Sequence, residues 1–328
     1  MRSLLRTLRE VRHCATYSTM AKDVGSELSV PVPWGHIRGK VWGLDHGRPV
    51  LCLHGWADNC GTFNTLIPLL PKECRYVAMD LSGHGLSSHL PPGESYSCPT
   101  YVMDVRRVVD ALQLRTFSLI GHSMGADIAA MFSALYPEMV DALVLLDSFG
   151  FLPTDSKELP EVVRQGMEEM LQLEKKTKEE KRVYTHEKAV ERLLAANPTL
   201  TEQSVHVLLE RGLVQVEGGF KFSRDLRIYS KNTWRMSLEQ SLEMQSRVRA
   251  SVLLVLTDKG FSRSFSEPSQ RKFNSTLLRS LKDRNHTVVT VPGDHHVHLD
   301  EPEVVAPIVS DFLRNRAPSQ SNNVQQKL

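Results

Sequence analysis

The sequence predicts an α/β fold with a mostly parallel central sheet, helices on both faces and a largely helical insertion. Short segments that are apolar almost throughout alternate with segments whose apolar residues recur at helical spacing. Continuously apolar strands are typical of parallel sheets that are covered on both faces. The alternation breaks at Phe149, where a long stretch of charged, helix-like sequence begins.

The first half of the chain supplies most of the predicted sheet. Residues 27–44 predict two antiparallel strands, each about half buried. Further strands are expected within 49–55, 76–85, 117–123 and 142–148, and helices at 61–71, 100–114 and 124–137. Functional residues of parallel sheets usually lie at the carboxyl ends of the strands. Four polar residues stand at or just past such ends: His54, Asp80, Ser123 and Asp147.

The second half predicts an insertion followed by the return of the core. In the insertion, the run of charged residues at 160–182 indicates a helix with a solvated face. Gly218-Gly219 indicates the turn of a hairpin. Strands then follow at 250–260 and 286–293. A closing helix is expected at 301–316, with Pro302 in its first turn and Pro307 kinking or shortening it.

These elements divide the chain into one core, one insertion and two ends. The predicted boundaries are a leader at 1–26, a core at 27–149 and 248–316, an insertion at 150–247 and a disordered tail at 317–328.

Composition excludes several classes of protein. The formal net charge is +2 and no basic stripe carries interleaved aromatics, so nothing favours a nucleic-acid partner. No stretch approaches the roughly 18 apolar residues of a membrane-spanning helix. The five cysteines are odd in number and irregularly spaced, which fits neither a disulfide framework nor a zinc site and favours a reducing, intracellular compartment.

The two ends carry weak address signals. The leader has arginines at positions 2, 6, 9 and 12 opposite an apolar face, as mitochondrial transit peptides do. The tail ends in Gln-Lys-Leu, which is close to the peroxisomal Ser-Lys-Leu address. We expect an intracellular protein, cytoplasmic or peroxisomal, with a mitochondrial location as the alternative that the leader offers.

The segment Gly-His-Ser-Met-Gly, residues 121–125, stands where a strand pattern becomes a helix pattern. A serine at such a sharp turn stands clear of its own backbone, and the glycines relieve the crowding that the turn creates. Ser123 is therefore the predicted nucleophile, with Gly121, His122 and Gly125 as its supporting neighbours. The amide of Met124, at the start of the next helix, points towards a developing oxyanion.

A second loop is expected to complete the oxyanion hole. His54-Gly55 ends the buried strand at 49–55, and the residue that follows is Trp56. The Trp56 amide is the candidate for the second donor, with His54 and Gly55 in support.

Three histidines, His295, His296 and His298, follow the last predicted strand. Such a cluster raises the question of a metal site, but zinc needs three or four converging ligands and the sequence offers no matching Asp/His or Cys cluster elsewhere. The sequence therefore predicts neither a metal nor a cofactor here. A catalytic base at this position is the preferred interpretation.

The motifs "LHGWADN", "MDLSGHGLSS", "IGHSMGADIA" and "PGDHHVHLDEP" together resemble those of the α/β-hydrolase superfamily over residues 28–316. The flanking segments "VPVPWGHIRGKVWG" and "PVLCLHGWADN" are similar to the vertebrate serine hydrolase-like proteins. The resemblance implies the α/β-hydrolase fold and makes His295 the base, because it follows Gly293-Asp294 as in the family's Gly-x-His motif. His296 and His298 are expected to have a supporting role or to face solvent.

The acid of the catalytic triad is ambiguous. Most members of the superfamily carry it in a Gly-x-x-Asp loop, at the position that is Gly260 in this chain. Asp258 lies two residues earlier, whereas some relatives place the acid at the end of the strand before the insertion, where Asp147 stands. Asp147 is preferred and Asp258 remains the alternative; Asp80 is expected to tie down the Ser-Gly-His-Gly turn.

The expected function is that of a serine hydrolase, an esterase-like enzyme that cleaves a small or medium ester or thioester through an acyl-enzyme. The insertion would cap the site, and six of its apolar residues are candidates to line an acyl pocket: Met167, Met170, Leu171, Leu173, Trp234 and Met236. Because Gly260 replaces the usual acid, a catalytically weak protein that only binds a ligand is the alternative.

Overall fold

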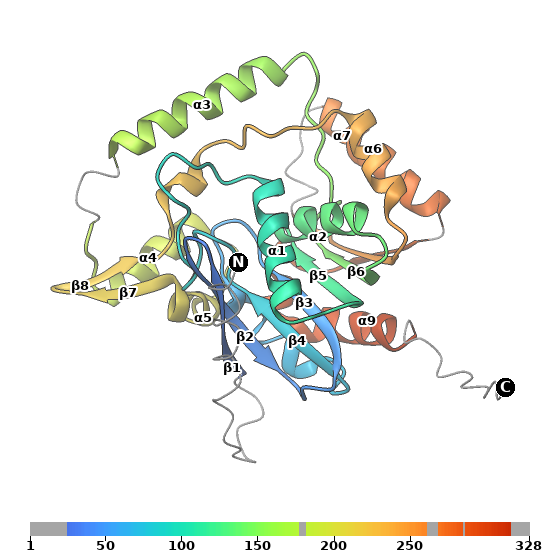
Figure 1. The fold of residues 1–328 in the computed structure, drawn as a ribbon, viewed down its shortest axis with the longest axis horizontal. Helices are drawn as coiled ribbons and strands as arrows, with labels where there is room; N and C mark the ends of the chain where they lie inside the picture. The colour runs from blue at the N-terminus through green and yellow to red at the C-terminus, as the bar shows by residue number, and fades with distance from the viewer. Residues whose placement is uncertain (1–24, 177–181, 261–267, 285, 316–328) are drawn as a thin grey trace, which may run out of the picture.

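The structure, a computed structural model, describes residues 25–176, 182–260, 268–284 and 286–315 (Figure 1). A sheet of eight strands runs through its centre in the order β1-β2-β4-β3-β5-β6-β9-β10. The first two strands are antiparallel, β1 (Ser26–Val32) and β2 (Gly35–Trp42). The parallel strands are β3 (Arg48–Leu53), β4 (Cys74–Met79), β5 (Phe117–His122), β6 (Val140–Leu146), β9 (Ser251–Thr257) and β10 (Thr287–Val291).

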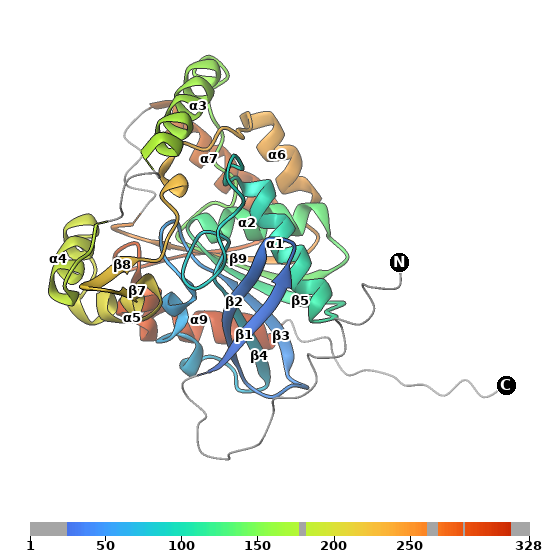
Figure 2. The same ribbon diagram turned by 60° about the vertical axis from the view of Figure 1, so that its left-hand side comes forward.

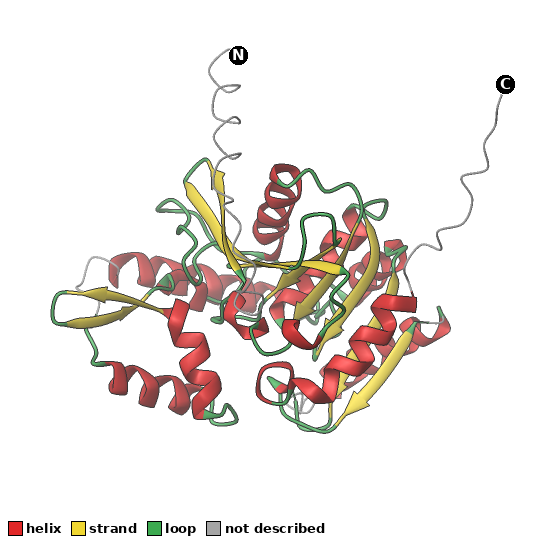
Figure 3. Cartoon of the chain, turned by 90° about the horizontal axis from the view of Figure 1, so that it is seen from below, coloured by secondary structure: helices red, strands yellow, loops and turns green. Residues whose placement is uncertain are grey.

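Helices cover both faces of the twisted sheet, as Figure 3 shows, which confirms the predicted α/β class. One face is covered by α1 (Cys98–Ala111), α2 (Met124–Leu135), α6 (Leu238–Arg247) and α7 (Pro268–Asp283), whose apolar residues form the larger core. The other face is covered by two 3₁₀-helices, η2 (Cys60–Phe63) and η3 (Ile67–Leu69), and by α9 (Pro302–Asn315).

Two sequence expectations for these layers need correction. The apolar spacing at 61–71 predicted one helix, but the segment forms η2 and η3, with Pro68 inside the first turn of η3. Pro68 has no amide hydrogen to donate to a preceding α-helical turn, which favours two short pieces. Pro307 does not shorten α9, because the helix continues to Asn315, whereas the kink stays a prediction.

The predicted insertion, residues 150–247, falls between β6 and β9, and its described residues are mainly helical. It contains α3 (Leu159–Lys176), α4 (His186–Ala196), α5 (Glu202–Gly212), η4 (Leu226–Tyr229), α6, and the predicted hairpin of β7 (Leu213–Val216) and β8 (Gly219–Phe222). Thr185, Thr201 and Ser237 begin three of these helices with side-chain caps. In Figures 1 and 2, α4, α5 and the hairpin lie together, whereas α3 stands apart from them.

Buried ion pairs join the insertion to the core. Arg211, at the end of α5, donates two hydrogen bonds to Oδ2 of Asp80, at 3.0 and 2.8 Å, and a third to Glu27 at 2.6 Å. Asp80 also accepts from the amides of Cys60 and Leu86, so it ties down the turn after β4 as expected. Removing one partner of such a buried pair leaves an uncompensated charge, so the contact fixes how the insertion sits.

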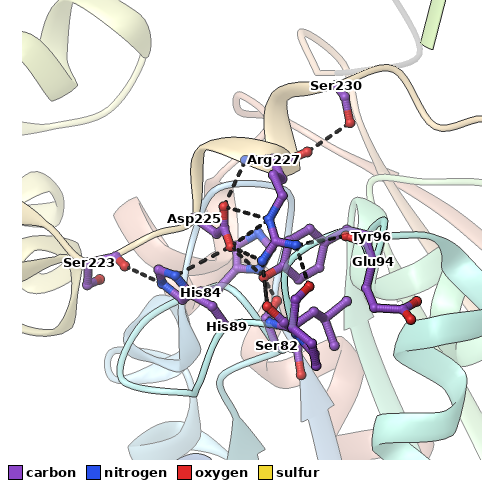
Figure 4. A network of polar contacts seen from close by, with 11 residues as sticks. Ser82, His84, His89, Glu94, Tyr96, Ser223, Asp225, Arg227 and Ser230 are labelled. Atoms are coloured by element: carbon purple, nitrogen blue, oxygen red, sulfur yellow. Dashed lines mark hydrogen bonds and ion pairs between the residues drawn. The ribbon is translucent and has the colours of Figure 1, made fainter. Parts of the chain in front are cut away.

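A second polar network joins the same two parts (Figure 4). Arg227 of η4 pairs with Asp225 at 2.7 Å and donates to the carbonyl oxygens of Leu90, Pro91 and Glu94. Tyr96 donates its hydroxyl hydrogen to Asp225 at 2.9 Å. The guanidinium therefore holds η4 against the loop that follows β4.

The ends of the chain lie outside the described residues, so the address signals of the leader and the tail stay predictions. Among the described residues, none of the helices combines the length and apolar character needed to cross a bilayer. The four described cysteines are free thiols, and Cys52, Cys60 and Cys74 are buried.

Candidate active site

Ser123 lies at the turn between β5 and α2, with φ 52° and ψ −120°. Residues other than glycine rarely adopt this backbone conformation, because it costs of order 1–3 kcal/mol. A Cβ atom on Gly121 would lie 2.4 Å from the Gly125 carbonyl oxygen, and one on Gly125 would lie 2.1 Å from the carbonyl oxygen of Leu53. The two glycines therefore allow the turn to pack against β3.

Met124 and Trp56, the two predicted oxyanion donors, line the same cavity as Ser123. Met124 is the first residue of α2, so its amide has no acceptor within the helix. Trp56 lies in the loop after β3 and lines the same cavity as Ser123 and Met124. Its indole Nε1 donates to the carbonyl oxygen of Ile228 at 2.8 Å, which joins this loop to the insertion.

His54 and Gly55 support the loop that carries Trp56. His54 is fully buried; its Nε2 accepts from the Leu81 amide at 3.0 Å, so Nδ1 carries the hydrogen and donates to the Gly55 carbonyl oxygen at 2.7 Å. The ring thus fixes the ends of β3 and β4 to each other.

His295 lies beside Asp147, from the end of the strand before the insertion. The distance between His295 Nδ1 and Asp147 Oδ2 is 2.6 Å, a short hydrogen bond between the imidazole and the carboxylate. The other carboxylate oxygen, Oδ1, accepts from both the amide and the hydroxyl of Thr257, each at 2.9 Å. Asp147 is buried and its backbone φ is 48°, a conformation that Asp tolerates better than most residues.

The alternative acid, Asp258, has a different contact. Its Oδ1 accepts from the Gly293 amide at 2.9 Å, at the start of the loop that carries His295. The residue at the family's usual acid position, Gly260, lies against Asp147: a Cβ atom there would be 2.1 Å from Asp147 Oδ2 and 1.8 Å from Thr257 Oγ1.

A cluster of rings surrounds His122. His122, fully buried, has its ring centroid 4.6 Å from that of His295, 4.9 Å from that of His296 and 4.1 Å from that of His298. His122 Nε2 contacts the His295 carbonyl oxygen at 2.9 Å, and His298 Nε2 contacts Thr62 Oγ1 at 2.9 Å. Burial lowers the pKa of His122 well below its ordinary value and that of His298 to about 3, so both rings are neutral.

The fold adds Asp58 to this cluster, a residue that sequence analysis missed. Its Oδ2 lies 3.2 Å from His296 Nε2 and 3.9 Å from His122 Nδ1. Burial opposes ionisation of both partners, but their mutual attraction outweighs it, raising the pKa of His296 and lowering that of Asp58. The only signal in the sequence was the position of Asp58, in the loop just after a buried strand.

A cavity of about 340 Å³ brings these groups together. It is lined by residues of the core loops and of the insertion: Gly55, Trp56, Asp58, His122, Ser123, Met124, Asp127, Ser148, Leu152, Asn197, His295 and His296. None of the six apolar residues predicted to line an acyl pocket is among them, and Met167 and Leu171 are instead 55% and 53% exposed. That expectation was wrong because α3, which carries four of the six, contributes no residue to the lining of the cavity.

The cavity also contains an unanticipated carboxyl group. Asp127 lies one turn into α2, and its Oδ1 accepts from Ser148 Oγ at 2.8 Å. Burial raises the pKa of Asp127 to about 7, although the hydrogen bond from Ser148 opposes the shift.

Comparisons with known proteins agree with this geometry. The family model described as "alpha/beta hydrolase fold" matches residues 48–302. A serine hydrolase-like protein of Danio rerio is 50% identical over 321 residues, which cover 98% of this chain and 97% of that protein.

Solved structures give the same result. A crystal structure of a hypothetical protein from Pseudomonas aeruginosa superposes with a TM-score of 0.77 at 31% identity, covering 88% of this chain and 98% of that one. The thioesterase domain from the curacin biosynthetic pathway superposes with a TM-score of 0.71 at 25% identity, covering 87% and 98%. The chain therefore belongs to the α/β-hydrolase superfamily and is a hydrolase-like member, similar over its whole length to the serine hydrolase-like proteins.

Proposed function

We propose that the protein is a serine hydrolase that cleaves a small or medium ester or thioester through an acyl-enzyme on Ser123. The observation that carries the proposal is the 2.6 Å contact between His295 Nδ1 and Asp147, at a cavity that Ser123 also lines. A histidine held at Nδ1 by a carboxylate keeps Nε2 available to accept a proton from the serine hydroxyl.

The reaction follows from these positions. Ser123 Oγ attacks the acyl carbon while His295 Nε2 takes its proton, and the carbonyl oxygen becomes an oxyanion facing the amides of Met124 and Trp56. Collapse of this intermediate breaks the bond to the leaving alkoxide or thiolate, which takes the proton from His295. Water then attacks the acyl-enzyme while His295 Nε2 takes its proton. The second intermediate releases the carboxylic acid and returns the proton to Ser123. Asp147 stays ionised throughout and stabilises the imidazolium.

The size of the cavity supports the substrate class. About 340 Å³ lies at the lower end of the range for small-molecule sites. Leu152 and Asn197 from the insertion border it, which supports a role for the insertion as a cap that limits access of water. Similarity to a thioesterase domain supports testing thioesters beside oxygen esters.

A catalytically weak ligand-binding protein is the second candidate, and Gly260 is the observation that favours it. The proximity of Asp147 to His295 weighs against this alternative, because a carboxylate already occupies the space next to Gly260.

Hydrolysis of p-nitrophenyl esters and acyl thioesters of graded chain length tests the proposal. We expect turnover that is highest for short to medium acyl groups, with a burst of leaving group wherever deacylation is slow. His295→Gln should abolish it, and His296→Gln should retain more activity. Absence of turnover with every ester and thioester in the folded protein would favour the ligand-binding alternative.

A further inference from the structure

We propose that Asp58, His122 and His296 form a binding site for one divalent transition-metal ion of the Zn²⁺ class, beside Ser123. The three ligand atoms, Asp58 Oδ2, His122 Nδ1 and His296 Nε2, all lie within 4.8 Å of one another. A carboxylate and two imidazoles are a donor set that Zn²⁺ accepts in sites with an open position.

The tautomer of His122 is the first argument. Its Nε2 lies 2.9 Å from the carbonyl oxygen of His295, which can only accept, so the hydrogen is on Nε2 and Nδ1 carries the lone pair. Histidines that bind metals almost always donate their other ring hydrogen in this way, often to a backbone carbonyl. His122 Nδ1 is buried and has no hydrogen-bond partner among the described residues.

The direction of that lone pair is the second argument. It faces Asp58 Oδ2 at 3.9 Å, so two electron-rich atoms confront each other in a buried place. Asp58 already pairs with His296, but the buried lone pair of His122 has no donor opposite it, which is unfavourable. A cation among the three atoms satisfies that lone pair as well.

The spacing is the third argument. Tetrahedral bonds of 2.0–2.1 Å to zinc place ligand atoms about 3.3 Å apart. The observed separations of 3.2 Å between Asp58 and His296 and 3.9 Å between Asp58 and His122 are close to this value, and the third pair of ligand atoms lies within 4.8 Å.

Gly55 and the cavity provide room and access. A Cβ atom on Gly55 would lie 2.9 Å from His122 Nδ1 and 3.3 Å from Asp58 Oδ2, so the glycine leaves space where the ion would stand. All three ligands line the cavity that Ser123 also lines, which gives the ion an entry path and a fourth position open to the cavity. An ion there takes up space next to the nucleophile, so occupancy should slow hydrolysis.

Binding is tested on the full chain with Co²⁺ and Zn²⁺ alone. We expect one Co²⁺ per chain with the visible absorption of a four-coordinate site, displacement by Zn²⁺, and an X-ray absorption spectrum of the Zn²⁺ form with two imidazole ligands. Asp58→Asn and His296→Gln should each weaken Zn²⁺ affinity by about a hundredfold or more, because each removes one of three protein ligands. Added Zn²⁺ should inhibit ester hydrolysis by the wild type in proportion to the fraction of sites that it occupies. The same concentrations should not inhibit the two variants.

His206→Gln is the matched control. The rings of His206 and His186 stack on the insertion with their centroids 5.4 Å apart, so this pair could bind a metal ion at the surface. The His206→Gln variant should leave the spectrum and the affinity unchanged. The proposal is overturned if folded wild-type protein binds neither ion, which would leave Asp58 and His296 as a plain ion pair. It is equally overturned if Asp58→Asn and His296→Gln bind Zn²⁺ as the wild type does, or if only His206→Gln loses binding.

Discussion

A Cβ atom on Gly260 would lie 2.1 Å from Oδ2 of Asp147, the oxygen that contacts His295. The usual acid position of the family and the carboxylate of Asp147 therefore compete for the same space. A side chain at position 260 excludes Asp147 from its place, and Asp147 requires a glycine there. This relationship explains why the chain departs from the common motif without losing a carboxylate beside the histidine.

Gly260→Ala tests that relationship. The added methyl group must displace Thr257 Oγ1 and Asp147 Oδ2, and a misplacement of this size should lower ester hydrolysis by about a hundredfold. Gly212→Ala is the control, because its nearest neighbours lie at 3.8 and 3.9 Å, and it should leave the rate unchanged. Equal rates in both variants would show that Asp147 is not needed where it lies.

Asp147→Asn should lower kcat by about 10³–10⁴-fold with the fold intact, because an amide cannot hold the imidazole in the productive tautomer or stabilise its charged form. Asp258→Asn keeps a side-chain oxygen that can accept from the Gly293 amide, so it should have a much smaller effect. Steady-state kinetics of the two variants distinguish them, and a reversal of their order would move the acid to the strand after the insertion.

The strained backbone of Ser123 predicts a difference in stability between two inactive variants. At φ 52° and ψ −120°, glycine is favoured over alanine, so Ser123→Gly should be more stable than Ser123→Ala by about 1 kcal/mol. Thermal unfolding of both proteins measures the difference. A lower melting temperature for the glycine variant would show that the turn stores no strain.

Asp127 predicts a pH-dependent stability. Its pKa in the folded protein, about 7, lies above the ordinary value of 3.8, so the folded state retains a proton that the unfolded chain releases. The stabilisation from that proton is fully present below pH 3.8 and is lost as the pH rises through 7. Asp127→Asn should therefore gain stability relative to the wild type between about pH 5 and about pH 8, by a few kcal/mol at most. Melting temperatures are measured for the wild type and Asp127→Asn at each pH. A difference between the two proteins that stays constant across this range would exclude a carboxyl group that ionises at this position.

Local sequence was sufficient where one segment carries both the structure and the chemistry. The turn at Ser123 follows from two glycines between a strand pattern and a helix pattern. The place after the last strand pointed to three histidines, and only the family resemblance singled out His295 among them. The same reasoning failed for α3, because an amphipathic pattern predicts a helix without saying what its apolar face meets. Met167 and Leu171 therefore fitted a pocket lining equally well before their exposure was known.

Contacts between segments that are distant in the sequence could not be predicted from local sequence patterns. Asp58 and His296 are 238 positions apart, and only the parallel order β3-β5-β6-β9-β10 brings their loops to one edge of the sheet. The choice between Asp147 and Asp258 had the same origin. Both follow neighbouring strands, β6 and β9, and they differ in their contacts, which are with His295 for Asp147 and with the Gly293 amide for Asp258.

The central claim is that Ser123 is an activated nucleophile, and labelling with a fluorophosphonate probe tests it most directly. Phosphonylation needs an activated hydroxyl and a formed oxyanion hole but no knowledge of the acyl substrate. We predict that the wild type is labelled on the peptide that contains Ser123 and that Ser123→Ala is not labelled. A folded wild type that resists the probe, or a Ser123→Ala variant labelled as strongly as the wild type, would contradict the assignment.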